Sequence, residues 1–161
     1  MSWVKNREEF KQAALSTARA VSKNQDLEST SQASSRPPSS SQISLQYPPR
    51  SSSQVDAWRG EGDFQAFWQT FHKEYPSIKM PKIARDFFAE LELSRVEMIG
   101  GDKFPGAKIN LNAYLNTLAK KGIDNKVHPF NPLAANLWLK QLNGESLPED
   151  SKKTVTAFLS S

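Results

Sequence analysis

Residues 83–111 have the sequence IARDFFAELELSRVEMIGGDKFPGAKINL, and we expect this stretch to decide the fold. It contains no glycine or proline before Gly100, and its apolar residues recur at the three- and four-residue spacing of a helix. The main apolar stripe consists of Ile83, Ala84, Phe87, Phe88, Leu91, Met98 and Ile99. The pattern predicts a helix of roughly four turns that ends at Gly100 and Gly101. A loop and a second helix, capped by Asn110 or Asn112, are expected to follow.

The other residues of this helix indicate how it packs. Ala89, Leu93 and Val96 form a second apolar patch outside the main stripe, so we expect the helix to pack on two sides. Arg95 projects into the main stripe, where an unpaired charge is costly, and Glu92, one turn earlier, is its predicted partner. The predicted polar edge, whose two glutamates we interpret as solvated, contains Arg85, Asp86, Glu90 and Glu97.

Two helices are predicted before this stretch. Residues 7–22 form a short amphipathic helix, because Asn6 and Glu9 have the spacing of a capping box and apolar residues follow at helical intervals. A second helix is expected after Asp63, its predicted N-cap, and Pro76 prevents it from continuing. The aromatic stripe of this second helix, which is typical of a core, consists of Phe64, Phe67, Trp68 and Phe71.

The C-terminal part continues the helical pattern. The helix that follows the loop is expected to end at Gly122. A further helix is predicted with Asn131 as its N-cap, and another follows a capping box of Ser146 and Glu149. No segment alternates with a period of two for long enough to indicate a strand. The sequence therefore predicts an all-α fold with an N-terminal helix at residues 1–23 and a compact core domain of about five helices at residues 55–161.

Residues 24–54 differ from the rest of the chain because serine, glutamine and proline dominate them. Such a composition offers too few apolar side chains to offset the entropy of ordering, so we interpret the segment as a disordered linker. The alternative is a docking motif around Ile43, Leu45 and Tyr47.

Composition limits the classes of function. The chain has 161 residues, 37% of them hydrophobic, and no cysteine, which excludes disulfides and thiolate metal sites. No apolar run is long enough to span a bilayer, and the N-terminus does not resemble a secretion signal, so a cytoplasmic protein without membrane partners is expected. The formal net charge is +4, but basic and acidic residues are interleaved, so we expect a solvated surface and no nucleic-acid partner.

Nucleotide and metal sites are not predicted. Gly101 and Gly106 have the spacing of a phosphate-binding loop, but Ala107 displaces the lysine by one residue, and Ile109 stands where the hydroxyl residue should follow that lysine. The two histidines lie far apart in the sequence, at His72 and His128, and His72 is interpreted as a cation near a helix C-terminus. We therefore expect no cofactor and no catalytic or metal-binding residue in this chain.

One string of residues resembles a known family. The residues from Glu92 to Gly100, ELSRVEMIG, followed by Gly106 and by Asn110, resemble the E-x-A-R-V-E-x-x-G … G-x-x-x-N-L segment of CobT, a subunit of the aerobic, ATP-dependent cobaltochelatase. Weaker similarities to the N-terminal helical region of the same family occur at Pro48-Pro49-Arg50, at Arg59-Gly60 to Asp63, and at Phe10-Lys11 to Arg19-Ala20.

The resemblance implies a non-catalytic assembly or coupling subunit, or a fragment of one, in a complex that inserts cobalt into a corrin ring during cobalamin biosynthesis. It implies an AAA+ ATPase subunit and a large tetrapyrrole-binding subunit as partners, with ATP, magnesium and cobalt handled outside this chain. The family continues into an acidic linker and a von Willebrand A-type domain, whose D-x-S-x-S signature does not occur in this sequence. The alternative is a free-standing helical protein–protein adaptor without a chelatase role.

The candidate interaction or structural motif consists of Glu92, Arg95, Glu97, Gly100, Gly106 and Asn110. Its charged members allow two interpretations: an ion-paired unit that fixes helix packing, which we favour, or a surface for a partner subunit.

Overall fold

The computed structural model describes residues 3–39, 41–75 and 77–161; Pro76, which was predicted to limit a helix, lies outside them. The described residues contain six α-helices, and five of these follow residue 54, which confirms the predicted helices, although the expectation of an all-α fold without strands is wrong because two short strands pair. The helices are α1 (Trp3–Ser22), α2 (Val55–Phe71), α3 (Lys82–Lys103), α4 (Pro105–Asp124), α5 (Pro132–Leu142) and α6 (Glu149–Leu159). Two short strands, β1 (Ser29–Thr30) and β2 (Ile43–Ser44), pair in parallel, and a 3₁₀ turn, η1 (Ser52–Gln54), precedes α2.

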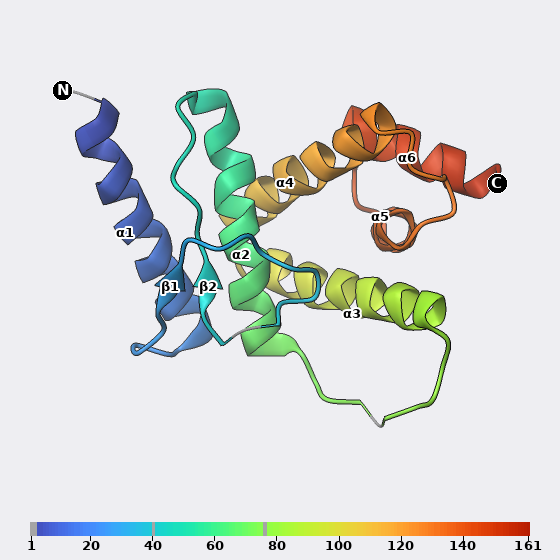
Figure 1. Ribbon diagram of the computed structural model, residues 1–161, viewed down its shortest axis with the longest axis horizontal. Coiled ribbons are helices and arrows are strands. Elements are labelled where there is room, and N and C mark those ends of the chain that lie inside the picture. Colours follow the sequence, from blue (N-terminus) through green and yellow to red (C-terminus); the bar gives the residue numbers. More distant parts are fainter. Residues whose placement is uncertain (1–2, 40, 76) are drawn as a thin grey trace.

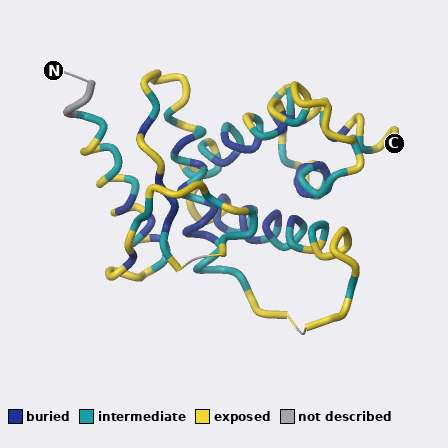
Figure 2. The backbone as a smooth tube through the Cα atoms, viewed as in Figure 1, coloured by how far each residue is buried: buried dark blue, intermediate teal, exposed yellow. Residues whose placement is uncertain are grey.

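Helix α2 lies at the centre of the fold, with α1 on one side and α3 and α4 on the other (Figure 1). Helices α3 and α4 extend away from α2, and α5 and α6 pack against them and against each other. Buried residues are concentrated where α2 meets its neighbours (Figure 2). Phe64 and Phe67 of α2 have no exposed surface, which confirms that the aromatic stripe belongs to the core.

Two glycines allow helices to approach closely. A Cβ atom on Gly60 of α2 would lie 2.2 Å from the backbone oxygen of Asn110 in α4, so only glycine fits this crossing. A Cβ atom on Gly100 would lie 2.3 Å from Cδ2 of Phe67. Gly100 therefore makes room for an aromatic ring of α2, and it does not end α3 as predicted.

The connection between α3 and α4 is shorter than expected. Helix α3 continues through Gly100 and Gly101 to Lys103, and only Phe104 separates it from Pro105, the first residue of α4. The predicted loop is thus mostly helical, because proline is well tolerated in the first turn of a helix. Asn110 and Asn112 lie inside α4, so the prediction that one of them caps it is wrong.

The prediction that residues 24–54 form a disordered linker is also wrong. Leu27, Ile43 and Leu45 are at most 2% exposed and belong to the hydrophobic core. The side chain of Gln65 in α2 accepts a hydrogen bond from Ser44 N (2.7 Å) and donates one to Ser44 O (3.0 Å). A few apolar anchors, together with hydrogen bonds to their backbone, therefore hold a segment of low overall hydrophobicity against α2. Of the alternative docking motif, Ile43 and Leu45 are buried in the core of their own chain, whereas Tyr47 is 63% exposed.

Of the other predicted helix ends, one was correct and three were wrong. Asn131 Oδ1 accepts a hydrogen bond from Ala134 N (3.1 Å) and caps α5, as predicted. Asn6 with Glu9, and Asp63, lie inside α1 and α2, since both helices begin earlier than expected. The capping box at the start of α6 does not form. Instead, Asn116 of α4 accepts a hydrogen bond from Ser151 N at 2.9 Å.

Candidate functional site

The predicted pair of Arg95 and Glu92 is present, and it ties α3 to the end of α2. Arg95 donates two hydrogen bonds to the Glu92 carboxylate, at 2.8 Å from Nε and at 2.7 Å from Nη2. Arg95 Nη2 also donates to the carbonyl oxygen of Phe71 at 2.9 Å, and His72 Nδ1 lies 3.0 Å from Glu92 Oε1. The hydrogen bonds from Arg95 hold the pKa of Glu92 below its usual value. Because Phe71 and His72 lie at the C-terminal end of α2, this cluster fixes how α2 and α3 meet.

Glu97 does not join this cluster, although the sequence grouped the two glutamates together. Glu97 is 1% exposed and Glu90 is 8% exposed, so the prediction that they form a solvated edge is wrong. They share the buried face of α3 with Leu93 and Val96, which formed the second and smaller apolar patch in the sequence. In the main stripe, by contrast, Ile83 is 55% exposed.

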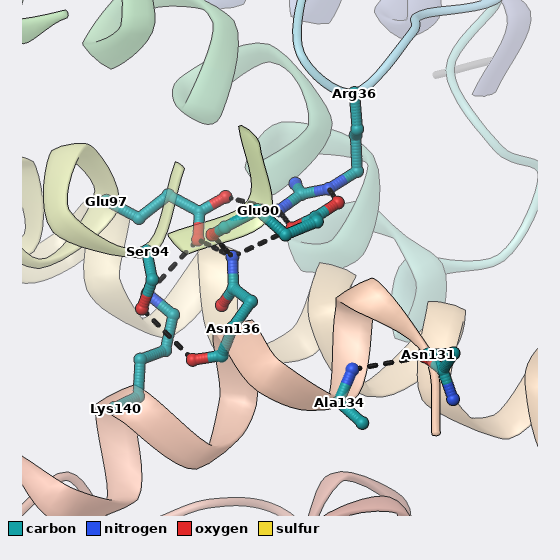
Figure 3. A network of polar contacts seen from close by, with 8 residues as sticks. All are labelled: Arg36, Glu90, Ser94, Glu97, Asn131, Ala134, Asn136 and Lys140. Carbon is teal, nitrogen blue, oxygen red and sulfur yellow. Dashed lines mark hydrogen bonds and ion pairs between the residues drawn. The ribbon is translucent and has the colours of Figure 1, made fainter. Parts of the chain in front are cut away.

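The two buried glutamates belong to a charge network that the sequence did not reveal. This network, here called the buried quartet, consists of Arg36, Glu90, Glu97 and Lys140. Arg36 Nε and Nη2 each lie 3.0 Å from an oxygen of Glu90, and Nη2 lies 2.8 Å from Glu97 Oε1. Lys140 Nζ lies 3.1 Å from Glu97 Oε2. Arg36 reaches these carboxylates from the segment between β1 and β2, and Lys140 reaches them from α5 (Figure 3).

Neutral polar side chains complete the quartet. Asn136 Nδ2 lies 3.0 Å from Glu90 Oε2 and 3.2 Å from Glu97 Oε2, and Ser94 Oγ donates to the carbonyl oxygen of Asn136 at 3.0 Å (Figure 3). Within the described parts of the chain, only Arg36 Nη1 and Asn136 Oδ1 are buried side-chain atoms without a hydrogen-bond partner. The network thus joins three segments that are distant in sequence, and most of its polar atoms are satisfied, as burial requires.

Electrostatics explain why Glu97 and Arg36 stay charged. Burial alone would raise the pKa of Glu97, but the charges of Arg36 and Lys140 and the hydrogen bond from Asn136 outweigh burial and lower it. Burial would likewise lower the pKa of Arg36, but Glu97 and Glu90 raise it well above the usual value. Two cations and two carboxylates balance inside the fold. Such a site is suited to fixing the packing of helices, and it is poorly suited to exchanging protons with a substrate.

A second polar site lies between α1, α2 and α4. Asn110 Nδ2 donates to Asp63 Oδ2 at 2.9 Å, and both residues line a cavity of about 420 Å³ together with Arg59 and Gly106. Two of the motifs that carried the family resemblance therefore meet here, although 47 positions separate Asp63 from Asn110. Burial raises the pKa of Asp63 to about 6, although Asn110 and Arg59 oppose this effect.

We predict that Asp63→Asn stabilises the protein above pH 6. The folded-state pKa of about 6 exceeds the usual 3.8, so the stabilisation from protonated Asp63 is full at low pH and is lost as the pH rises through 6. The shift corresponds to a cost of about 2–3 kcal/mol for the ionised group, which asparagine avoids while keeping an acceptor for Asn110. Urea unfolding at pH 7.5 should show the gain, and at pH 4 the two proteins should be nearly equal. Asp26→Asn, at an exposed position, is the matched control; equal gains for both variants would contradict the prediction.

A row of aromatic rings, here called the aromatic row, is formed by Phe87 of α3, Phe130, Phe158 of α6 and Trp138 of α5; Phe130 is exposed and the other three are partly buried. Ring centroids are 4.8 Å apart for Phe87 and Phe130, 5.6 Å for Phe130 and Phe158, and 6.2 Å for Phe158 and Trp138. Phe130 is 53% exposed, and Ile83, one turn before Phe87, is 55% exposed. The row connects three helices and exposes mainly the ring of Phe130, and an exposed aromatic ring supported by its neighbours is typical of a contact site.

The predicted motif residues are thus divided among several places. Glu92 and Arg95 form the cluster at the end of α2, Glu97 belongs to the buried quartet, and Gly100 packs against Phe67. Gly106 and Asn110 line the cavity around Asp63. Among the described residues, no group of three histidine, aspartate or glutamate side chains is arranged to hold a metal ion. None of the described helices combines the length and the apolar character that crossing a membrane requires.

Comparison with known proteins gave one match. A family model described as "Cobalamin biosynthesis protein CobT" matches residues 4–158, which is nearly the whole chain. Neither the curated proteins nor the solved structures contain a match.

Proposed function

Because the chain belongs to the CobT family of cobalamin biosynthesis proteins, we propose that it is a non-catalytic assembly subunit, or part of one, of a cobaltochelatase. In this proposal the complex inserts cobalt into a corrin ring, and the chain couples an AAA+ ATPase subunit to a large tetrapyrrole-binding subunit. ATP, magnesium and cobalt are bound by the other subunits. The described residues of this chain contribute contacts and rigidity.

The aromatic row is the observation that carries this proposal. Aromatic residues are enriched at protein–protein contacts, where a few of them supply most of the binding free energy. The ring of Phe130 is held between those of Phe87 and Phe158, so it is presented to a partner in a fixed orientation and little side-chain entropy is lost on binding.

The buried quartet supports the same proposal indirectly. It joins α3 to α5 through buried charges. Helix α3 carries Phe87, and α5 carries Trp138. A surface that three separate helices supply can act as one contact site only if those helices keep their relative positions. The quartet provides this rigidity between α3 and α5, and α6 is held by its packing against α5 and α4.

Co-purification tests the proposal. The tagged full-length chain is mixed with the AAA+ ATPase subunit and the large tetrapyrrole-binding subunit at low salt, and each retained subunit is quantified. We expect retention by the wild-type chain and about tenfold weaker retention by Phe130→Glu, because a charge would be buried at the contact. Ile109→Glu is the matched control, since Ile109 is 65% exposed on α4 outside the aromatic row.

The outcome separates the two functions considered for this chain. Retention of neither subunit by a correctly folded wild-type chain would contradict the chelatase assembly proposal and favour a free-standing helical adaptor. Equal retention by Phe130→Glu and Ile109→Glu would show that assembly uses a surface other than the aromatic row.

A further inference from the structure

The cavity around Asp63 has the features of a ligand site, and the assembly function does not use it. Its volume is about 420 Å³, and it lies between α1, α2 and the corner where α3 meets α4. Apolar side chains form much of its wall, including Ala14 and Val21 of α1 and Phe104 and Ala107 at the corner. A cavity of this volume, with an apolar wall and a few polar groups, is typical of small-molecule sites.

The charged residues that line this cavity are Arg59, Asp63 and Lys103. Within the described parts of the chain, neither Arg59 nor Lys103 forms an ion pair or a side-chain hydrogen bond. Arg59 acts on Asp63 through its charge alone, and the ammonium group of Lys103 lies 5.0 Å from the centre of the Phe71 ring. The positive charges therefore outnumber the negative ones here, and the guanidinium of Arg59 is available to an acceptor that the described residues do not supply.

Asp63 is placed to act together with Arg59. The two residues are four positions apart on α2, so they share a face of that helix, and both line the cavity. Asn110 Nδ2 donates to Asp63 Oδ2 at 2.9 Å, and no other hydrogen bond to this carboxyl group is formed among the described residues. Because the pKa of Asp63 is about 6, the group readily carries a proton, and a protonated carboxyl group is a hydrogen-bond donor.

These donors match a carboxylate better than a phosphate group. The guanidinium of Arg59 and a protonated Asp63 together offer donors to the two oxygens of a carboxylate, and such charge-assisted bonds are strong. A phosphate group has a third oxygen to satisfy. Thr17, the one hydroxyl residue among the described lining residues, already donates to the carbonyl oxygen of Ala13 at 3.0 Å.

Helix packing explains part of this region but not all of it. Gly60 is needed for the close approach of α2 to α4, and Asn110 joins the same two helices through Asp63. Arg59 precedes Gly60 in the same motif, but it makes no hydrogen bond within the described chain that would hold a helix in place. A ligand gives this arginine a role that packing does not.

We propose that this cavity binds a small monocarboxylate with an apolar body, and that the ligand carboxylate lies between the guanidinium of Arg59 and the carboxyl group of Asp63. The apolar body packs against the wall that Val21 and Phe104 help to form. The cavity is separate from the aromatic row, so this proposal goes beyond the assembly function and does not depend on it.

Binding of this ligand takes up a proton near neutral pH. Two carboxyl groups in contact cannot both ionise, so Asp63 and the ligand keep one proton between them. The other charged side chains of the lining are Arg59 of α2 and Lys103 of α3, which both stay positive in this range, and the described lining residues of α1 and α4 are uncharged. The affinity should therefore rise as the pH falls through 6.

Isothermal titration calorimetry of the full-length chain with 3-phenylpropionate tests the proposal. We expect binding about tenfold tighter at pH 5.5 than at pH 7.5, because the protonated form of Asp63 is then the major one. The neutral analogue 3-phenylpropionamide should bind at least about tenfold more weakly, since it lacks the charge that Arg59 recognises. Acetate should also bind about tenfold more weakly, since it leaves the apolar wall uncovered.

Two variants locate the binding. Arg59→Gln should weaken the binding of 3-phenylpropionate about tenfold at both pH values. Arg50→Gln is the matched control, because Arg50 is exposed and does not line the cavity. Asp63→Asn should bind at pH 7.5 about as tightly as the wild type binds at pH 5.5, without the pH dependence, since asparagine donates without a negative charge. Misfolding cannot produce this gain in affinity.

Several outcomes would overturn the proposal. These are no binding of 3-phenylpropionate by the folded wild type at pH 5.5, equal binding by Arg59→Gln, or equal binding of the amide. Tighter binding of 2-phenylethyl phosphate would contradict the choice of a carboxylate. Tighter binding of acetyl-glycyl-glycyl-phenylalanine would assign the site to the C-terminus of a partner chain and overturn a small-molecule ligand. None of these results depends on whether the chelatase subunits co-purify, so the two proposals fail separately.

Discussion

Arg36→Met is expected to lower the free energy of unfolding by about 3–5 kcal/mol, which is the usual cost of removing one partner from a buried ion pair. Arg36 makes three charged hydrogen bonds, two to Glu90 and one to Glu97. Methionine keeps much of the apolar stem, but it leaves two buried carboxylates, of which only Glu97 keeps a cation, Lys140. Arg36 Cζ also lies 4.8 Å from the centre of the Phe64 ring, so a favourable cation–π contact disappears as well.

Urea unfolding monitored by circular dichroism measures this effect, and Arg50→Met is its control. Arg50 belongs to the same segment of the chain and is exposed. Its replacement should change the free energy of unfolding by less than about 0.5 kcal/mol. A small change in the free energy of unfolding for both variants would contradict the buried quartet. It would instead support the disordered linker that composition predicts for residues 24–54.

The pH dependence of Arg36→Met gives a second readout. The pKa of Glu97 is lowered in the folded protein, so its contribution to stability is present above the pKa of the unfolded chain and is lost as the pH falls through the folded value. Without Arg36, the pKa of Glu97 is lowered less, or it is raised by burial. The difference in stability between the wild type and Arg36→Met should therefore be largest near neutral pH and should narrow as the pH falls below the usual pKa of glutamate.

The positions of the helices could be predicted from the sequence, but the buried face of α3 could not. Counting apolar residues favoured the stripe that contains Ile83 as the buried face. Ile83 itself is 55% exposed. The buried face contains Leu93 and Val96 together with Glu90 and Glu97, and a pattern of hydrophobicity treats both glutamates as evidence for solvent. Their seven-residue spacing, on the side of the smaller apolar patch, was the signal that could have indicated a buried ionic site.

The ordered structure of residues 24–54 could not be predicted, because composition describes the average hydrophobicity of the segment and not its individual buried residues. Three apolar residues, Leu27, Ile43 and Leu45, bury almost all of their surface, and the rest of the segment needs only hydrogen bonds from neighbours. Those neighbours, such as Gln65, are distant in sequence and become partners only in the folded chain. The same reason hid Arg36, which has no acidic residue near it in sequence.

The candidate site was predictable where its contacts are local. Glu92 and Arg95 are three residues apart on one helix, and their pairing could be predicted from spacing alone. The contact between Asp63 and Asn110 joins two helices and could not be predicted from periodicity, which assigned both residues to helix caps. Helix caps and helix contacts use the same small polar residues, so sequence pattern alone does not separate them.

Gly60→Ala is expected to lower the free energy of unfolding by about 3 kcal/mol, at the upper end of the usual cost of overpacking. The new Cβ atom would lie 2.2 Å from the backbone oxygen of Asn110 and 2.8 Å from Cβ of Tyr114, and neither atom can move without moving α4. Alanine favours a helix over glycine by about 1 kcal/mol, so helix propensity alone predicts the opposite sign. A lower midpoint in urea would show that the approach of α2 to α4 outweighs propensity.

Gly106→Ala is the matched control for this comparison. Gly106 also lies in a helix, but a Cβ atom placed there meets no other atom within 4 Å, so helix propensity acts alone and the free energy of unfolding should rise by up to about 1 kcal/mol. If Gly60→Ala were as stable as Gly106→Ala, the close approach of α2 to α4 at Gly60 would be contradicted. The hydrogen bond from Asn110 to Asp63, which depends on the same approach, would then also be lost.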